Sequence, residues 1–292
     1  MTIKKVQQIL PPAPAHMVGD GFKVHNFFPS GYNISNRRMS PFFMLDYNAQ
    51  MELSPSETPR GVGVHPHRGF ETVTIAYQGK IAHGDSFGNK GIISEGEVQW
   101  MTAASGILHK EYHEEAFSKK GGLFQMVQLW VNLPAKDKMS KPKYQALTRA
   151  LIQESTHHLP LVRVEVIAGN YQDTHGAAST FSPIELYNLQ LSSGGKIQLH
   201  FPAEYNTGLL VIEGSVLINQ TENAAQDHFA LFENVGTDII LEASADARLL
   251  VLSGEPINEP IASYGPFLMN SQEEIRQAVI DFNSGKFGYL AD

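Results

Sequence analysis

The clearest strand signal in the chain is Thr72-Val-Thr-Ile-Ala-Tyr-Gln-Gly-Lys-Ile81. Val73, Ile75 and Tyr77 fall on one face of an extended backbone, because successive side chains of a strand point to opposite sides. Gln78-Gly79 then supplies a turn, after which a second extended run begins. The segment therefore predicts a β-hairpin whose first strand is half buried.

Further short segments carry the same alternation. Val162, Val164 and Val166 share one face of the run 161–167. Gly, Asn and Asp separate the remaining predicted strands, which are 185–191, 209–213, 215–219, 238–242 and 248–252. Short strands separated by turn residues are typical of a β-sandwich or β-barrel, so the sequence predicts an all-β fold.

A second segment repeats the pattern of the first. Gly208-Leu-Leu-Val-Ile-Glu-Gly-Ser-Val-Leu217 also consists of a strand, a glycine turn and a second strand. The turn glycines Gly79 and Gly214 lie 135 residues apart, which is close to half of the 292-residue chain. The polar stretch at 133–142, which contains prolines, is typical of a linker. The sequence therefore predicts two similar β-domains, 1–135 and 136–292.

One helix is predicted near the C-terminus. Ser271-Gln-Glu-Glu274 fits a capping box, and apolar residues then recur at helical spacing up to Phe282. Ser284-Gly285 provides an end to the helix. We expect this helix to pack on a sheet and to carry no chemistry.

Composition narrows the classes of protein. Hydrophobic residues make up 42% of the chain, enough for sizeable buried cores. Cysteine is absent, which excludes disulfides, thiol nucleophiles and cysteine-ligated metal sites. The formal net charge of -8 gives no general attraction to nucleic acid or to an anionic membrane. No apolar run approaches the roughly 20 residues that span a bilayer, and the first residues do not resemble a secretory signal, so we expect a cytoplasmic protein.

The histidines give the most specific signal. His65-Pro-His67 precedes the strand at Val73, and residues i and i+2 of an extended chain project to the same side. His109 and Glu111 repeat this relation in the segment Gly106-Ile-Leu-His-Lys-Glu111. If the two strands line one barrel, three imidazoles and one carboxylate converge.

Such a set of side chains suits a divalent transition metal: iron, manganese, cobalt, nickel, copper or zinc. Four protein ligands around an octahedral ion leave two positions for water, substrate or dioxygen. Two alternatives stay open: Glu71 could supply the carboxylate instead of Glu111, and His113 shares the nominal face of His109. Solvated or hydrogen-bonded side chains are expected for the other histidines, which are His16, His25, His83, His157, His158, His175, His200 and His228.

Several motifs together resemble the pirin family of the cupin superfamily. They are Gly63-Val-His-Pro-His-Arg-Gly-Phe-Glu-Thr-Val73, Gln99-Trp-Met-Thr-Ala-Ala-Ser-Gly-Ile-Leu-His-Lys-Glu111, Gln128-Leu-Trp-Val-Asn-Leu-Pro134, Ser253-Gly-Glu-Pro-Ile-Asn-Glu-Pro260 and Gly265-Pro-Phe-Leu-Met-Asn270. The resemblance runs from about residue 35 to residue 289. It implies two face-to-face cupin β-barrels, a bicupin, with a short C-terminal helix.

The resemblance also implies where a metal binds. Residues 1–135 would form an N-terminal barrel with a mononuclear Fe(II) site, whose ligands fall on His65, His67, His109 and Glu111. Residues 136–292 would form a metal-free barrel that carries the helix, because the region around His200 has one histidine where a pair would be needed. The general cupin pattern also contains a glutamate after the His-x-His motif, so Glu71 stays a candidate.

Two functions follow from the resemblance. Some pirins are quercetin 2,3-dioxygenases, which open a flavonol ring with O2; here Glu111 or Glu71 would act as the catalytic base. The small aromatic substrate would need apolar walls, for which the candidates are Phe42, Phe43, Met44, Phe70, Trp100 and Met101. Other pirins are iron-dependent regulators that bind transcription factors or metabolic enzymes, which would imply a protein partner. A third possibility is another cupin chemistry, such as an isomerase, since fold alone does not select a reaction.

Overall fold

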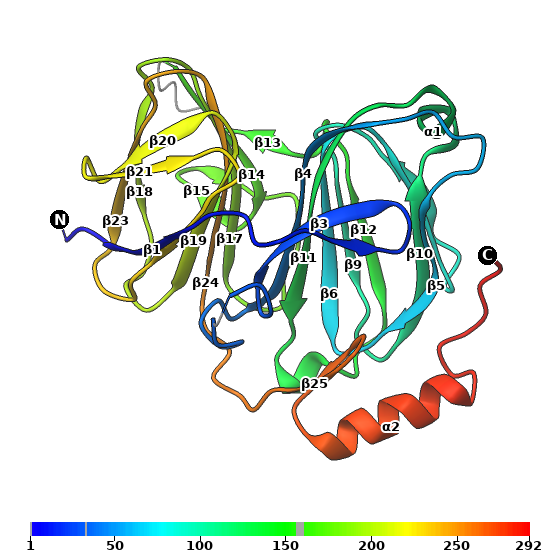
Figure 1. The fold of residues 1–292 in the computed structure, drawn as a ribbon. Helices are drawn as coiled ribbons and strands as arrows, with labels where there is room; N and C mark the ends of the chain where they lie inside the picture. Colours follow the sequence, from blue (N-terminus) through cyan, green and yellow to red (C-terminus); the bar gives the residue numbers. More distant parts are fainter. Residues whose placement is uncertain (1, 33, 156–160) are drawn as a thin grey trace. The chain divides into compact units, whose positions relative to one another are not determined.

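The computed structural model describes residues 2–32, 34–155 and 161–292 (Figure 1). The chain divides into two compact units, each drawn from three segments. Unit 1 comprises Met1–Ala13, Phe27–Pro41 and Arg149–Pro256, and unit 2 comprises Pro14–Asn26, Phe42–Thr148 and Ile257–Asp292. The division therefore differs from contiguous domains at 1–135 and 136–292, because each terminal segment belongs to the unit formed by the other half of the chain.

Unit 2 contains two antiparallel sheets. The larger sheet has the order β12 (Lys143–Leu147), β9 (Val98–Thr102), β6 (Phe70–Gln78), β11 (Gly122–Asn132), β4 (Phe42–Leu53), β3 (Phe22–Phe28) and β2 (His16–Val18). The smaller sheet has the order β5 (Gly61–His67), β10 (Ile107–His113), β7 (Ile81–Asp85) and β8 (Lys90–Ile93). Helix α1 (Glu115–Lys120) leads into β11, and the 3-10 turn η1 (Ala135–Asp137) follows it.

The C-terminal segment completes unit 2. It forms a hairpin of β25 (Ala262–Tyr264) and β26 (Phe267–Met269), followed by helix α2 (Gln272–Asn283), and it lies at one end of the strands of this unit (Figure 1). The predicted capping box is confirmed, since the Ser271 side chain accepts from the Glu274 backbone and the Glu274 side chain accepts from the Ser271 backbone. None of the described helices is long and apolar enough to cross a membrane.

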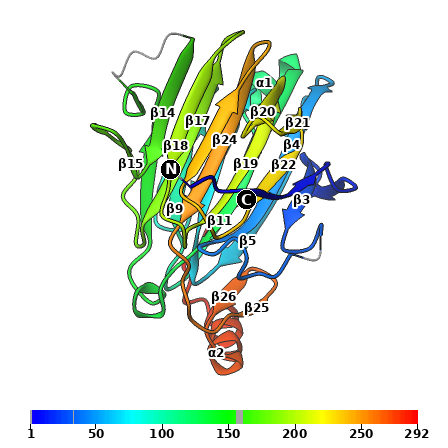
Figure 2. The same ribbon diagram turned by 90° about the vertical axis from the view of Figure 1, so that its left-hand side faces the viewer.

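Unit 1 repeats the two-sheet plan. Its larger sheet has the order β1 (Val6–Leu10), β22 (Phe229–Phe232), β19 (Asn206–Glu213), β24 (Ala247–Gly254), β17 (Ile184–Leu191), β14 (Val162–Ala168) and β13 (Gln153–Glu154), and Figure 2 shows its central strands side by side. Its smaller sheet has the order β18 (Lys196–His200), β23 (Asp238–Glu242), β20 (Ser215–Ile218) and β21 (Glu222–Ala225). A short ribbon of β15 (Asn170–Tyr171) and β16 (Thr174–His175) is added. The predicted all-β class is confirmed.

The predicted repeat corresponds to the consecutive strands β6–β7 and β19–β20. The predicted β-hairpin is wrong, because β6 and β19 belong to the larger sheets whereas β7 and β20 belong to the smaller sheets. The turn glycines, Gly79 and Gly214, have φ values of +80° and +76°, a left-handed region that favours glycine. The prediction that β6 is half buried is wrong, because Thr72 and Thr74 are each only 1% exposed. Every residue of β6 from Phe70 to Tyr77 is buried, so both faces of this central strand are covered.

The polar stretch at 133–142 lies inside unit 2, which extends to Thr148. Lys138 is 1% exposed, and its ammonium group donates to the carbonyls of Gly69 and Leu268 and to the side chain of Asn132 at 2.6 to 2.8 Å. Burial lowers the pKa of Lys138 to about 7. The residues that suggested a linker therefore hold the C-terminal hairpin to the start of β6.

Candidate metal centre and adjoining cavity

Three histidines converge as the sequence predicts. Strands β5 and β10 pair antiparallel with His109 opposite His65 and Ile107 opposite His67, which brings both histidine motifs to one place. One nitrogen from each of His65, His67 and His109 lies within 4.8 Å of the other two. The ring centroids are 4.2 to 4.8 Å apart. These residues, which we call the histidine triad, could hold a metal ion.

The hydrogen bonding of the histidine triad fits a metal. His65 Nδ1 donates to the carbonyl of Gly63 at 2.8 Å, which leaves Nε2 as a ligand atom. His109 is 1% exposed, and neither of its ring nitrogens has a hydrogen-bond partner among the described residues. Burial lowers the pKa of all three imidazoles, so they are neutral ligands. Because buried unpaired nitrogens are costly, a metal ion is the group that would satisfy them.

Glu111 lies beside the histidine triad and faces the same cavity. A register shift between β10 and β5 separates His109 from Glu111, so on β5 the residue opposite Glu111 is Val62 and not one of the triad histidines. Its Oε1 accepts from the Thr74 hydroxyl at 3.0 Å. Burial raises the pKa of Glu111 to about 7. The carboxylate is not part of the group of ligand atoms within 4.8 Å.

Glu71 points to the other face of β6. Successive side chains of a strand alternate between its two faces, so Glu71 and Thr74, three residues apart, point to opposite faces. The face of Thr74 is the one toward Glu111, because the Thr74 hydroxyl contacts the Glu111 carboxylate. The carboxylate of Glu71 accepts from the Thr102 hydroxyl at 2.7 Å, and burial raises its pKa to about 7. The structure therefore does not bring Glu71 together with the histidine triad.

His113 also lies apart from the histidine triad. Its ring packs against Phe22 and Phe124 with centroids 5.4 and 4.8 Å away, inside the apolar core of unit 2. Burial lowers its pKa to about 4. His113 is thus a neutral packing residue, although it shares the strand face of His109.

A cavity of about 380 Å³ adjoins the histidine triad. Its wall includes the apolar side chains of Met44, Met126 and Trp130, together with the polar side chains of Asp46 and Gln128. Of the wall residues predicted from the sequence, Met44 lines this cavity. The other five are buried but do not line it: Phe42, Phe43, Phe70, Trp100 and Met101. The cavity combines apolar walls with a few polar groups, as small-molecule sites do.

Four polar residues of this region could not be predicted from the sequence, because the pairing of distant strands brings them here. His83 is buried opposite Glu111 on β7, and its Nε2 shares a hydrogen bond of 2.7 Å with the Tyr144 hydroxyl. Thr74, Gln128 and Asp46 are opposite one another on β6, β11 and β4. His16, His25, His175, His200 and His228 are exposed or partly exposed, as expected, while His157 and His158 lie outside the described residues.

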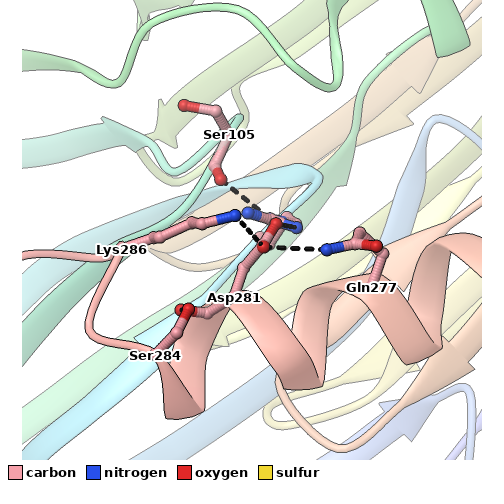
Figure 3. A network of polar contacts seen from close by, with 6 residues as sticks. Ser105, Gln277, Asp281, Ser284 and Lys286 are labelled. Atoms are coloured by element: carbon pink, nitrogen blue, oxygen red, sulfur yellow. Dashed lines mark hydrogen bonds and ion pairs between the residues drawn. The ribbon is translucent and has the colours of Figure 1, made fainter.

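A buried ion pair joins Arg68, in the turn that follows His67, to Asp281 of helix α2, and Figure 3 shows Asp281 with Gln277 and Lys286 around it. Arg68 Nη1 lies 2.9 Å from Asp281 Oδ2, and the two side chains are only 4% and 8% exposed. Arg68 Nε donates to the Ser105 carbonyl at 2.7 Å. Hydrogen bonds from Lys286 and Gln277, together with Arg68, hold the pKa of Asp281 down at about 2. Helix α2 therefore anchors this turn, a structural role that was not predicted from the sequence.

Comparison with known proteins supplies the family. The family model described as Pirin matches residues 21–131, and the Pirin C-terminal cupin domain matches residues 186–288. A Pseudomonas aeruginosa protein named "Putative quercetin 2,3-dioxygenase" is 47% identical over 285 residues, covering 98% of this chain and 99% of its own.

Solved structures agree with this match. Quercetin 2,3-dioxygenase from Acinetobacter baumannii has a TM-score of 0.92 and 46% identity, covering 99% of this chain and 100% of its own. The bacterial pirin of Escherichia coli, solved in complex with nickel(II), shares the fold at 22% identity with a TM-score of 0.65, covering 85% of this chain and 100% of its own. With two cupin barrels and a histidine triad on the predicted residues, this chain belongs to the pirin family and has its bicupin fold.

Proposed function

We propose that this protein is a metal-dependent dioxygenase that opens a flavonol such as quercetin with O2 at a mononuclear iron(II) site. The observation that carries the proposal is the histidine triad, which opens on an apolar cavity large enough for a small aromatic molecule. The likeness to proteins named as quercetin 2,3-dioxygenases, at 46% and 47% identity over nearly the whole chain, supports the choice of substrate.

The proposed metal ligands are His65, His67, His109 and Glu111. Neutral imidazoles and a carboxylate suit iron(II), and they also suit manganese, cobalt, nickel, copper and zinc. When bound, the metal would supply Lewis-acid binding and orientation for the flavonol 3-hydroxyl. The Thr74 hydroxyl holds Glu111 within the cavity wall, and this position makes Glu111 the proposed base for the hydroxyl proton. Glu71, the other candidate base, faces away from the cavity, so its proposed role is structural.

The aromatic and apolar wall would hold the substrate. Trp130 lines the cavity, and its ring centroid lies 5.3 Å from that of His67 and 4.2 Å from that of Phe70. Phe70 therefore supports Trp130 from behind, and the indole offers a fixed surface beside the histidine triad. A flat substrate packed on this surface would exclude water from the reacting ring. Binding of a protein partner, lack of direct nucleic-acid binding and a cytoplasmic location stay predictions.

An aerobic turnover assay tests the proposal. Protein stripped of metal is reconstituted with Fe(II) without air, quercetin is added, and air is then admitted while flavonol absorbance and oxygen uptake are followed. We expect metal-dependent loss of quercetin that falls by at least about 100-fold in His67→Ala, since a metal supplies several kcal/mol to such steps. Stoichiometric bound iron without turnover would contradict the proposal and favour the regulatory function.

The two glutamates make separate predictions for metal binding. Glu111→Gln is expected to weaken metal affinity by about 10-fold or more, because it removes the carboxylate proposed as the fourth ligand. Glu71→Gln should retain the metal, since its carboxylate contacts Thr102 on the opposite face of β6. Metal content after dialysis against a chelator measures both. The reverse pattern would transfer the ligand role to Glu71.

A further inference from the structure

Asp46 is a buried carboxylate in the cavity wall that the metal site does not use. It lies on β4 and is 7% exposed. Its Oδ1 accepts from Asn26 Nδ2 at 2.7 Å. Asp46 lines the same cavity as His65, His67 and Glu111. A buried carboxylate is costly unless hydrogen bonds satisfy it, and a ligand in the cavity can supply a further one.

The register of the larger sheet places Asp46 away from Glu111. Asp46 is opposite Gln128, which is opposite Thr74, so the three residues run across β4, β11 and β6. Thr74 Oγ1 lies 3.0 Å from Glu111 Oε1 and 2.8 Å from Gln128 Oε1. Two strand spacings separate Asp46 from Thr74, on the order of 10 Å. The carboxylate of Asp46 therefore lies across the cavity from the end where Glu111 meets the histidine triad.

The surroundings of Asp46 are apolar along the strands. Met44 precedes Asp46 by two residues on β4, and Met126 precedes Gln128 by two residues on β11; both methionines line the cavity. The polar side chains thus form a single narrow belt between apolar layers. The belt would contact a flat ligand at one position on the ligand's rim, and the two methionines would contact the faces of the ligand.

We propose that Asp46 accepts a hydrogen bond from a hydroxyl on the substrate ring remote from the metal, so that the cavity selects polyhydroxylated aromatic ligands. The inference rests on the proposed function, because it takes the histidine triad as the place of the reacting ring. A carboxylate accepts and an aromatic hydroxyl donates, and such charge-assisted bonds are strong when water is excluded. A ligand without that hydroxyl would exclude water from Asp46 without supplying this hydrogen bond, which is how polar sites reject such analogues.

Ligand deletion and residue deletion together test this assignment. Dissociation constants for quercetin and for galangin, a flavonol without hydroxyls on its pendant ring, are measured without air on metal-loaded protein through tryptophan fluorescence. The wild type is expected to prefer quercetin by about 10- to 100-fold. Asp46→Asn should lose most of this preference by weakening quercetin binding, with galangin binding little changed. Asp46→Ala provides a second variant if the first folds poorly.

Glu71→Gln is the matched control, since Glu71 is also a buried carboxylate but faces away from the cavity; its preference should equal that of the wild type. A wild-type preference near one, or an unchanged preference in both Asp46 variants, would overturn the role of Asp46 and leave the proposed function standing. Failure of the wild type to bind either flavonol would overturn the flavonol assignment and this inference with it.

Discussion

His109→Ala is expected to abolish metal binding while the barrel of unit 2 stays folded. Both ring nitrogens of His109 are buried without a partner among the described residues, so the ring adds little to folding in the absence of a metal. Loss of a ligand should reduce metal affinity by at least about 100-fold, more than the loss of a supporting residue. Elemental analysis of the purified variant measures the metal, and circular dichroism with thermal unfolding measures the fold.

His200→Ala serves as the control for His109→Ala. The His200 side chain is 70% exposed in unit 1, where its Nδ1 lies 3.3 Å from Asp238. Its removal should leave the metal content unchanged. Stoichiometric metal in His109→Ala would refute the assignment of the histidine triad as ligands. Loss of metal in His200→Ala would show that unit 1 also binds a metal.

The spacing of the histidines was sufficient to predict the triad, because both motifs obey the two-residue period of a strand. His65 and His67 must share a face, and the only further requirement was that β5 and β10 pair. The choice between Glu111 and Glu71 could not be made in this way. Strand β6 is buried on both faces, so its sequence does not reveal which face lines the cavity. The contact of Thr74 with Glu111 resolves the face, and this contact depends on tertiary structure.

Residues distant in sequence escaped prediction for the same reason. Asp46 and Gln128 face each other only because β4 and β11 pair in one register. Arg68 and Asp281 are 213 residues apart, and charged residues on a terminal helix usually face solvent. One signal was present: Asp281 lies three residues after Ala278, on the buried side of the helix, where an unpaired carboxylate would be unexpected.

Asp281→Ala is expected to destabilise the C-terminal segment of unit 2 by about 3 kcal/mol, because it leaves the buried guanidinium of Arg68 without its partner. The variant also removes the acceptor for Lys286 and Gln277 (Figure 3). Local unfolding should precede global unfolding, since α2 is held to the strands by this pair and one small apolar cluster. Hydrogen exchange of residues 272–283 measures the local loss of stability. Metal content after treatment with a chelator measures whether His67, which precedes the turn, still binds the metal.

Glu273→Ala is the matched control for Asp281→Ala on the same helix. Glu273 pairs with Arg276, but their side chains are 78% and 66% exposed, so its loss should change stability by less than about 1 kcal/mol.

The buried pair of Arg68 and Asp281 also predicts a pH dependence, because the partners of Asp281 lower its pKa from 3.8 to about 2. The stabilisation by the ion pair is complete above pH 4 and is lost as the pH falls through about 2. The free energies of unfolding of the wild type and of Asp281→Ala should therefore converge near pH 2. Equal exchange rates in Asp281→Ala and Glu273→Ala at neutral pH would show that the buried pair does not anchor the helix.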